Sequence, residues 1–268
     1  MQRLKGKTAI ISGAGRNNGR AIAIAYAREG ADLVLIARSR SEELNAVAKE
    51  CESHGAKTLA LLGDVGAHED INRMVKAGLD HFGKIDISVS VAGIRSNKLP
   101  WEYSYEEWHR IFDVNLHSTF YLAKALAPGM MERRSGSFIA LGGNSATTAA
   151  FPYVAALAAS KHGLHGLIKG LAQAFGRYNV RANLLSLANI QNDRLNPEWY
   201  TVKNEKGEMI RTGQVGDPTS TEEDRYKLSP LGRQGTRQEV ASVAVFLASD
   251  ESSYVTGDRI IVSGGGYM

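Results

Sequence analysis

The sequence predicts a single α/β domain built on a doubly wound parallel sheet of seven strands, with helices on both faces of the sheet. Short apolar runs rich in β-branched residues alternate with longer helical stretches, and the runs are continuously apolar, as in strands that are buried on both faces. A glycine-rich loop separates the first run from the first helical stretch. No linker interrupts the alternation, so we expect one domain over residues 1–268.

The individual elements follow from this alternation of short apolar runs and longer periodic stretches. The predicted strands are Thr8–Ser12, Leu33–Ala37, Thr58–Leu62, Ile85–Val89, Ser137–Leu141, Val180–Leu185 and Arg259–Val262. The predicted helices include Gly19–Glu29, Ser41–His54, Ala67–Phe82, Tyr105–Arg133, Val154–Tyr178 and Arg237–Ala248.

One insert departs from the regular pattern. Residues 189–235, from Asn189 to Gly235, are polar and rich in Gly, Pro and charged residues, and they are far longer than an ordinary connection. Loops of this size in compact domains are usually functional, so we expect a lid that covers the substrate. A disordered surface loop is the alternative.

Composition narrows the class of protein. The net charge of +4 would suit a polyanionic partner, but basic residues are interspersed with acidic ones and the tightest basic cluster is Arg133-Arg134. We therefore expect no nucleic-acid partner. The single cysteine, Cys51, excludes an internal disulfide and favours the reducing cytosol, so we expect a cytoplasmic protein.

Two segments bear on membrane insertion. The apolar run Thr8–Ile11 is too short for a signal peptide. Residues 135–160 contain no charged residue and are long enough to span a bilayer, but Gly142, Gly143 and Pro152 interrupt them with turn formers. A buried strand, a loop and the start of a helix explain this segment better, and we expect no membrane partner.

The loop after the first predicted strand, SGAGRNNGR, carries the first functional signal. A glycine loop between a strand and a helix presents backbone N–H groups and the positive helix end to a pyrophosphate, as in Rossmann folds. The loop resembles the TGxxxGxG signature of the short-chain dehydrogenase/reductase family, with Gly13 and Gly19 at matching glycines. Asn17 replaces the middle glycine, and asparagine tolerates a positive φ. We expect Gly13, Arg16, Asn17, Asn18 and Gly19 to bind the cofactor.

The end of the second strand predicts which dinucleotide binds. An acidic residue at this place would hydrogen-bond the adenosine ribose and favour NAD. Arg38 stands there instead and suits a ribose 2′-phosphate, with Ser39, Arg16 and Arg40 nearby. We therefore expect NADP (NADPH) as the cofactor, with NAD the less favoured alternative. Arg38 as a solvated arginine beside a helix is the other interpretation.

Further motifs support the same resemblance, which covers the chain from Lys7 to Gly265. It implies that Asp64 and Val65 hold the adenine ring and that Asn115, in Asp113-Val114-Asn115, bends its helix and holds a water beside the catalytic lysine. It also implies that Ala92 and Gly93, in Ser90-Val91-Ala92-Gly93, line the cofactor site, and that Ile190 meets the nicotinamide carboxamide.

The catalytic positions are where the chain departs from the family. The family pattern YxxxK places a proton-donating tyrosine one helical turn from a lysine. Aligned on Lys161, the tyrosine position holds Leu157, and Asn144 stands where the family has a serine. The chain thus resembles the 3-oxoacyl reductase type but without the catalytic Tyr and Ser. The candidate catalytic residues are Lys161, which also binds the cofactor, together with Asn115, Asn144, Ser145 and Tyr153.

Three functions remain open from these residues. The first is an NADP-dependent oxidoreductase acting on a carbonyl or alcohol substrate through a rearranged proton relay of Lys161, Asn115 and a water or Tyr153. The second is a non-redox enzyme, an isomerase, lyase or dehydratase, in which Lys161 and Asn144 polarise a carbonyl. The third is a catalytically silent dinucleotide-binding protein.

The remaining expectations concern partners. We expect a small-molecule substrate and a homo-oligomer, with a tetramer implied by the family and by the long apolar faces of the helices at 105–133 and 154–178. We expect no metal site, because no acidic or cysteine motif accompanies His162 and His165.

Overall fold

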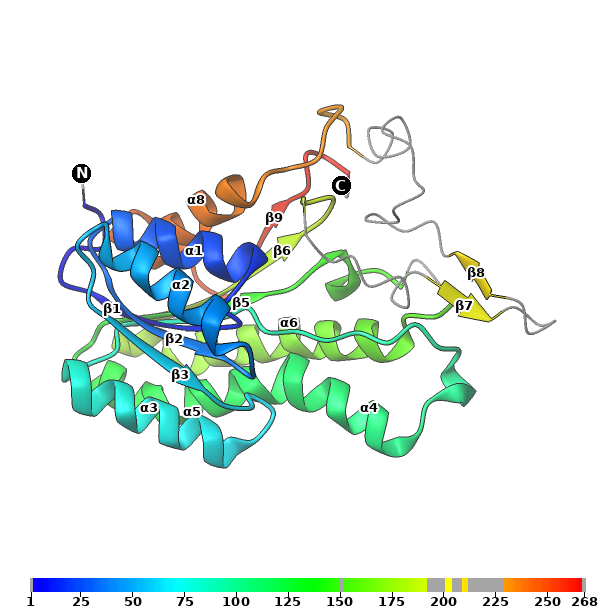
Figure 1. The fold of residues 1–268 in the computed structure, drawn as a ribbon, viewed down its shortest axis with the longest axis horizontal. Coiled ribbons are helices and arrows are strands. Elements are labelled where there is room, and N and C mark those ends of the chain that lie inside the picture. The colour runs from blue at the N-terminus through cyan, green and yellow to red at the C-terminus, as the bar shows by residue number, and fades with distance from the viewer. Residues whose placement is uncertain (1, 150–151, 192–200, 204–208, 212–228, 267–268) are drawn as a thin grey trace.

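A computed structural model describes residues 2–149, 152–191, 201–203, 209–211 and 229–266. Its main sheet has seven parallel strands in the order β3-β2-β1-β4-β5-β6-β9 (Figure 1). The strands are β1 (Thr8–Ser12), β2 (Asp32–Ala37), β3 (Thr58–Leu62), β4 (Ile87–Ser90), β5 (Gly136–Leu141), β6 (Val180–Leu187) and β9 (Arg259–Val262). The predicted fold class is confirmed.

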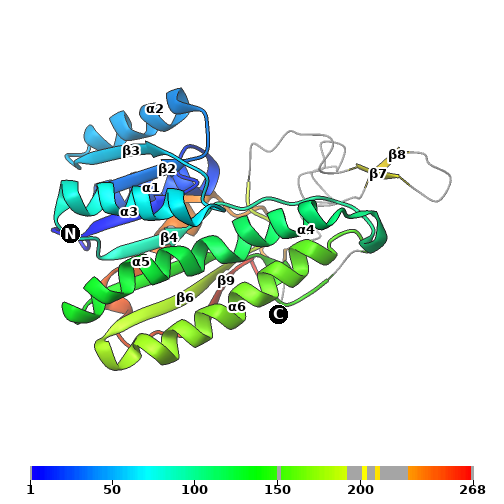
Figure 2. The same cartoon turned by 90° about the horizontal axis from the view of Figure 1, so that it is seen from below.

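The sheet is buried between two layers of helices, which lie above and below it in Figure 1, and Figure 2 looks onto the lower layer. One layer comprises α1 (Asn17–Arg28), α2 (Ser41–Glu52) and α8 (Arg237–Ala248). The other comprises α3 (His68–Phe82), α5 (Ser118–Glu132) and α6 (Ala155–Phe175), with α4 (Tyr105–Phe112) leading into α5. Each layer has its own cluster of buried apolar side chains against the sheet, as a doubly wound fold requires.

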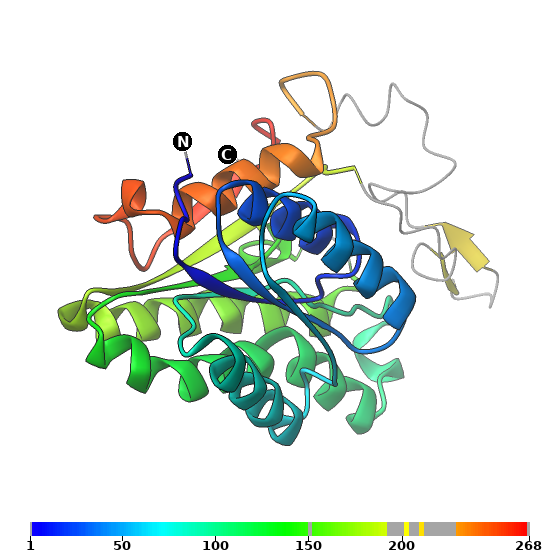
Figure 3. The same ribbon diagram turned by 60° about the vertical axis from the view of Figure 1, so that its left-hand side comes forward.

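The order of the strands indicates at which edge of the sheet a ligand would bind. β1 pairs with β2 on one side and with β4 on the other, so the chain winds in opposite directions from β1. In open α/β sheets, ligands bind outside the carboxyl ends of the strands at such a switch point. Figure 3 shows α1 beginning at that edge, directly after β1.

The predicted helical segment over Tyr105–Arg133 is helical throughout residues 105–132, but it is not a uniform α-helix. A π-helical turn, Asp113–His117, separates α4 from α5. Its buried Asn115 turns toward the loop after β4, where its Oδ1 accepts from the N–H of Ile94 at 2.8 Å and its Nδ2 donates to the carbonyl of Ile94 at 2.9 Å. The wider turn allows both bonds while the helix axis continues, and such turns often mark functional sites. The other predicted boundaries differ by three residues or fewer.

The insert at residues 189–235 is described only in part. Two short antiparallel strands, β7 (Thr201–Lys203) and β8 (Met209–Arg211), interrupt a segment that the sequence predicts to be irregular. The rest of the expected lid, at residues 192–200, 204–208 and 212–228, lies outside the described residues. At the base of the insert, Ile190 and Gly235 form a parallel bridge, with the N–H of Gln191 donating to the carbonyl of Gly235 at 2.9 Å.

The uncharged segment at residues 135–160 folds as expected. It forms β5, a short 3₁₀ turn and the start of α6. Within the described parts of the chain, none of the helices has both the length and the apolar character needed to cross a membrane.

The core on the α6 side provides a test of the packing. Phe138, on β5, is 1% exposed, and its ring lies 5.9 Å from that of Phe175 between centroids. Phe138→Ala should lower the free energy of unfolding by about 3–5 kcal/mol, because it removes buried apolar contacts and leaves a cavity. Tyr254→Ala is the matched control, since Tyr254 is fully exposed, and should change it by less than about 0.5 kcal/mol. Urea denaturation at one protein concentration measures both, and equal losses would contradict the assigned core.

Candidate functional site

A cleft of about 680 Å³ lies outside the carboxyl ends of the strands at the switch point. It brings together most of the residues predicted from the sequence, which come from loops far apart in the chain. The predicted residues that line it are Gly13, Arg16, Asn17, Asn18, Arg38, Ser39, Asp64, Val65, Ala92, Gly93, Asn144, Ser145, Lys161 and Ile190. Gly19, Asn115 and Tyr153 are not among its described lining residues.

The glycine loop is shaped by close backbone contacts. Gly13 has a φ of 68°, and a Cβ at this position would lie 2.9 Å from the backbone nitrogen of Ala92. A Cβ on Gly19 would collide with the carbonyl oxygen of Gly13. Both glycines are therefore needed for the loop to fold against the start of α1. Asn17 has a φ of 50°, so asparagine takes the left-handed conformation expected for the middle position.

The start of α1 offers a polar atom to a ligand. The Oδ1 atom of Asn18 is buried and has no hydrogen-bond partner among the described residues. Buried polar atoms in folded proteins are nearly always paired, with protein, water or ligand. Together with the N-terminal N–H groups of α1, this acceptor fits a bound molecule that carries both phosphate and N–H or O–H groups, as a nicotinamide dinucleotide does.

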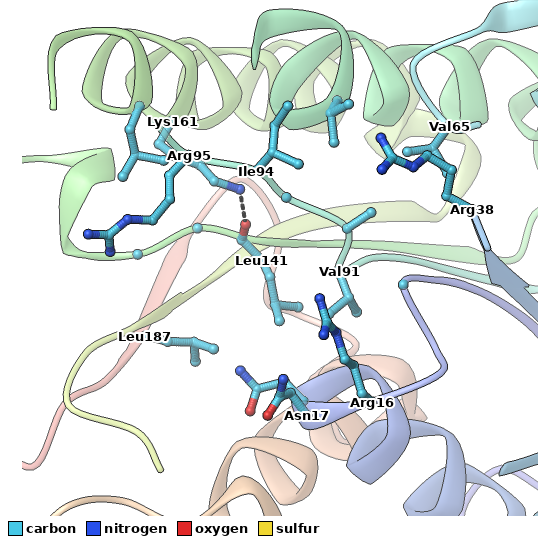
Figure 4. A pocket seen from close by; sticks show the side chains of 18 of the residues that line it. Arg16, Asn17, Arg38, Val65, Val91, Ile94, Arg95, Leu141, Lys161 and Leu187 are labelled. Carbon is cyan, nitrogen blue, oxygen red and sulfur yellow. Dashed lines mark hydrogen bonds between the residues drawn. The ribbon is translucent and has the colours of Figure 1, made fainter. Parts of the chain in front are cut away.

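The lining of the cleft is strongly basic. Among the described lining residues, six side chains are cationic and two are carboxylates: Arg16, Arg38, Arg40, Arg95, Arg110, Lys161, Glu43 and Asp64. Both carboxylates contact an arginine, since Arg40 pairs with Glu43 at 2.6 Å and Arg110 with Asp64 at 2.7 Å. Arg16 and Arg38 both extend into the cleft in Figure 4, and no described residue accepts a hydrogen bond from either guanidinium group. The cleft is therefore suited to a ligand with several negative charges.

Asp64 is held by its neighbours rather than exposed as an open acceptor. Arg110, on α4, donates to both carboxylate oxygens, and the N–H of Gly66 donates to Oδ1 at 2.9 Å. Burial by itself would raise the pKa of Asp64, but the hydrogen bonds from Arg110 and Gly66 bring that pKa below its ordinary value. The carboxylate is therefore ionised at neutral pH and fixes the loop after β3 against α4.

Asn115 lies directly behind the cleft. Besides its two bonds to Ile94, its Nδ2 donates to Ser160 on α6 at 3.2 Å. A Cβ on Gly93 would lie 3.4 Å from the Oδ1 of Asn115 and 3.8 Å from the Nζ of Lys161. Asn115 thus joins the loop after β4 to the helix that carries Lys161, and it positions both.

Lys161 projects from α6 into the cleft. It is 9% exposed, and its Nζ donates to the carbonyl oxygen of Leu141, at the end of β5, at 2.7 Å (Figure 4). Leu157, one turn earlier on the same helix, also lines the cleft. The described lining contains no tyrosine. Tyr153, the candidate donor four residues before Leu157, lies outside it. Asn144 and Ser145, on the 3₁₀ turn after β5, supply polar groups to the lining near Lys161.

Two basic lining residues escaped the prediction from sequence. Arg95 follows the predicted Ala92-Gly93 by two residues, so its nearness to that motif was an available signal. Arg110 lies on α4, and its pairing with Asp64 spans 46 residues of sequence, so no local pattern indicates it. Neither His162 nor His165 belongs to a metal-binding cluster in the described structure, where no group of three His, Cys, Asp or Glu side chains is placed to hold a metal ion.

Comparison with known proteins identifies the family. A family model described as enoyl-(acyl carrier protein) reductase matches residues 13–267. The 3-oxoacyl-[acyl-carrier-protein] reductase FabG of Staphylococcus epidermidis is 29% identical over 264 residues, covering 98% of this chain and 99% of that protein. The L-rhamnose 1-dehydrogenase (NAD(P)(+)) of a Sphingomonas species is 30% identical over 269 residues, covering 100% of this chain and 99% of that protein.

A solved structure agrees with these relatives. A short-chain type dehydrogenase/reductase from Mycobacterium marinum superimposes with a TM-score of 0.85 at 30% identity, over 100% of this chain and 97% of that one. The family match spans nearly the whole chain and includes the glycine loop, the switch point and the helix of Lys161. The chain therefore belongs to the short-chain dehydrogenase/reductase family of oxidoreductases, which bind a nicotinamide dinucleotide.

Proposed function

We propose that the protein is an NADP-dependent oxidoreductase that acts on a carbonyl or alcohol substrate through a proton relay that lacks the usual tyrosine. The observation that carries the choice of cofactor is the pair Arg16 and Arg38, which lines one end of the cleft with no carboxylate bound to either side chain among the described residues. Two guanidinium groups suit a ribose 2′-phosphate through charge-assisted hydrogen bonds. An acidic residue there would favour NAD instead.

The chemistry divides between the cofactor and the chain. When bound, the dinucleotide gives or takes the hydride. The chain's part is to orient the substrate and to move one proton to or from the substrate oxygen. In this proposal Asn144 and Ser145, which line the cleft, hydrogen-bond that oxygen, and Lys161 supplies positive charge beside it. Lys161 keeps its place through the carbonyl of Leu141 and through α6, which Asn115 ties to the loop after β4.

The proton step is the unusual part of the proposal. Leu157 occupies the helical position from which the family's tyrosine acts, and a leucine side chain has no proton to give. We therefore propose that a water held by Lys161 and Asn144 exchanges the proton with the substrate oxygen. Tyr153 is the less favoured donor, because it does not line the cleft. The absence of a positioned general acid should slow generic carbonyl reduction by about 10²- to 10⁴-fold.

Leu157 also favours a second candidate function. A non-redox isomerase, lyase or dehydratase needs a polarised carbonyl, which Lys161 and Asn144 can supply without the phenol. In such an enzyme the apolar wall at Leu157 would protect an enolate from unwanted protonation. Turnover without any net change in NADPH absorbance would identify this function.

The assembly and the insert belong to the same proposal. We propose a homo-oligomer, in line with the long α5 and α6 helices on one outer layer of the molecule and with Phe120, which is 45% exposed on α5. Light scattering at micromolar concentration tests it. We also propose that residues 189–235 cover the substrate, which agrees with Ile190 lining the cleft at the base of that insert, and that the protein works in the cytosol.

The glycine loop gives the first test of dinucleotide binding. Gly19→Ala should abolish detectable binding of NADP⁺ in calorimetry, because its Cβ would collide with the carbonyl oxygen of Gly13. Gly166→Ala is the matched control, since a Cβ there meets nothing within 4 Å on the same kind of helical backbone. Circular dichroism checks that both variants fold. A folded Gly19→Ala protein with unchanged affinity would show that the loop does not hold the pyrophosphate.

Arg38 gives the test of cofactor choice. Arg38→Met should weaken NADP⁺ binding by about tenfold or more, because one charge-assisted hydrogen bond is worth roughly 1.5–3 kcal/mol, while NAD⁺ binding stays the same. Arg28→Met removes an exposed arginine outside the cleft lining and should change neither affinity. Calorimetric titration of both dinucleotides measures this. Wild-type protein that binds NAD⁺ as tightly as NADP⁺ would refute the preference.

Leu157 gives the test of the proton relay. The double variant Leu157→Tyr with Asn144→Ser should place a phenol one turn from Lys161 with a hydroxyl partner nearby. It should raise NADPH-dependent reduction of generic carbonyls by about 10²-fold or more if proton transfer limits the rate. Ala155→Ser, at a half-buried position of α6 outside the cleft lining, is the control. A folded double variant that binds NADPH and gains nothing would show that the missing phenol does not limit reduction.

A further inference from the structure

Arg38 has a carboxylate close to it on the neighbouring strand. The strands β2 and β3 end side by side, with Ala37 opposite Leu62, so Arg38 leaves the sheet next to the segment that carries Asp64. Both side chains line the cleft, and Figure 4 shows Arg38 and Val65, the residue after Asp64, on the same side of it. Opposite charges attract at such short range, so Asp64 is the natural partner for Arg38.

Asp64 is bound by a different arginine instead. The Nη2 of Arg110, on α4, donates to Oδ1 at 2.9 Å and to Oδ2 at 2.7 Å, and the N–H of Gly66 also donates to Oδ1. Burial alone would raise the pKa of Asp64, but the hydrogen bonds from Arg110 and Gly66 lower it, with a smaller contribution from the charge of Arg38. Both carboxylate oxygens therefore have donors already, and no hydrogen bond joins Asp64 to Arg38 in the described structure.

Gly66 makes room for this contact. A Cβ at that position would collide with the Nη1 of Arg110. Gly66 lies outside the left-handed region of φ, so an alanine there would not strain the backbone. The collision would fall on the flexible end of the arginine side chain, which would have to move. A single methyl group can therefore displace Arg110 from Asp64 without changing any charge.

We infer that Arg110 is a positioning residue for the choice of cofactor. By binding Asp64, it keeps that carboxylate from pairing with Arg38 and leaves the Arg38 guanidinium to the ribose 2′-phosphate. This inference rests on the proposed function, which assigns Arg38 to that phosphate. Once released from Arg110, Asp64 would pair with Arg38 and bring negative charge beside the phosphate. NAD lacks the phosphate, so its binding would change much less.

The measured quantity is the ratio of the Kd for NAD⁺ to the Kd for NADP⁺, obtained by calorimetry on the whole protein. A general loosening of the loop after β3 would weaken both dinucleotides equally and leave this ratio unchanged. Arg110→Met should lower the ratio by about threefold or more, on the scale of a partly exposed ion pair. Arg110→Lys should keep part of the ratio, because an ammonium can also donate to the carboxylate.

A second variant perturbs the same contact without loss of charge. Gly66→Ala should also lower the ratio, because its Cβ displaces the guanidinium of Arg110 from Asp64. Gly166→Ala, whose Cβ meets nothing within 4 Å, is the matched control and should keep the ratio of the wild type. A fall in Arg110→Met without any fall in Gly66→Ala would assign the effect to the lost charge and would overturn the inference.

Removal of the released carboxylate gives the decisive comparison. Asp64→Asn in the Arg110→Met background should restore the ratio to within about twofold of the wild type. Glu106→Gln in the same background is the matched control, since Glu106 is exposed one turn earlier on α4 and lies outside the cleft lining. It restores the net charge equally and should not restore the ratio. Equal recovery in both double variants would overturn the inference, because net charge would then be the cause.

Folding is checked by circular dichroism for every variant. If Arg110→Met does not fold, Gly66→Ala carries the same comparison, alone and together with Asp64→Asn. A folded Arg110→Met protein that binds both dinucleotides with the ratio of the wild type would overturn the inference.

Failure of the proposed function has a different signature. A wild type that binds NAD⁺ as tightly as NADP⁺ would refute the cofactor choice, and the change in the ratio among the Arg110 variants would still decide the inference. A wild type that prefers NADP⁺, with the same ratio in every Arg110 variant, would leave the proposed function standing and remove only the role of Arg110.

Discussion

The close approach of two loops, one after β1 and one after β4, is the constraint on which the rest of the site depends. Ser12, the last residue of β1, accepts hydrogen bonds from the N–H groups of Val91 and Ala92 at 3.1 and 3.3 Å. Gly13 follows with a positive φ and leaves no space for a side chain beside Ala92. This contact forms at the point where the sheet changes its winding direction, and it holds the glycine loop against the loop after β4, which also lines the cleft.

A second set of contacts connects the loop after β4 to α6, the helix that carries Lys161. The loop after β4 continues to Ile94, which Asn115 holds through two hydrogen bonds from the π-helical turn. The same asparagine bonds Ser160, next to Lys161 on α6. A displacement of Asn115 would therefore disturb the cofactor side and the lysine together. The network fixes the turn of α6 next to Lys161, whose Nζ donates to the carbonyl of Leu141.

Much of the fold could be predicted from the sequence, because each buried strand is a short apolar run and each helix has an apolar face. The glycine loop could also be predicted, because a positive φ or close backbone packing restricts the residue types at Gly13, Asn17 and Gly19. The π-helical turn at Asp113–His117 was indicated only by the family resemblance, which implied that Asn115 bends its helix, because the turn depends on a contact with Ile94 rather than on any local helix breaker. Arg110 and its bond to Asp64 could not be predicted from local patterns, since the two residues meet only in the folded chain. Lys161 and Asn144 were identified from motif spacing, which gives the position of a residue along a helix or loop. Spacing does not give the direction of a side chain, so it could not show whether Tyr153 lines the cleft.

The bridge between Ile190 and Gly235 has a consequence for how such an enzyme can diversify. Two main-chain hydrogen bonds close the insert at its base, the N–H of Gln191 to the carbonyl of Gly235 and the N–H of Gly235 to the carbonyl of Asn189, both at 2.9 Å. Main-chain bonds impose little demand on side-chain identity, and lengthening a loop whose ends are already joined costs little additional entropy. Residues within the insert can therefore be exchanged, added or lost while β6 and α8 keep their places. Under the proposed function, in which this insert covers the substrate, changes there would alter the choice of substrate while the loops after β1 and β4 keep their contacts.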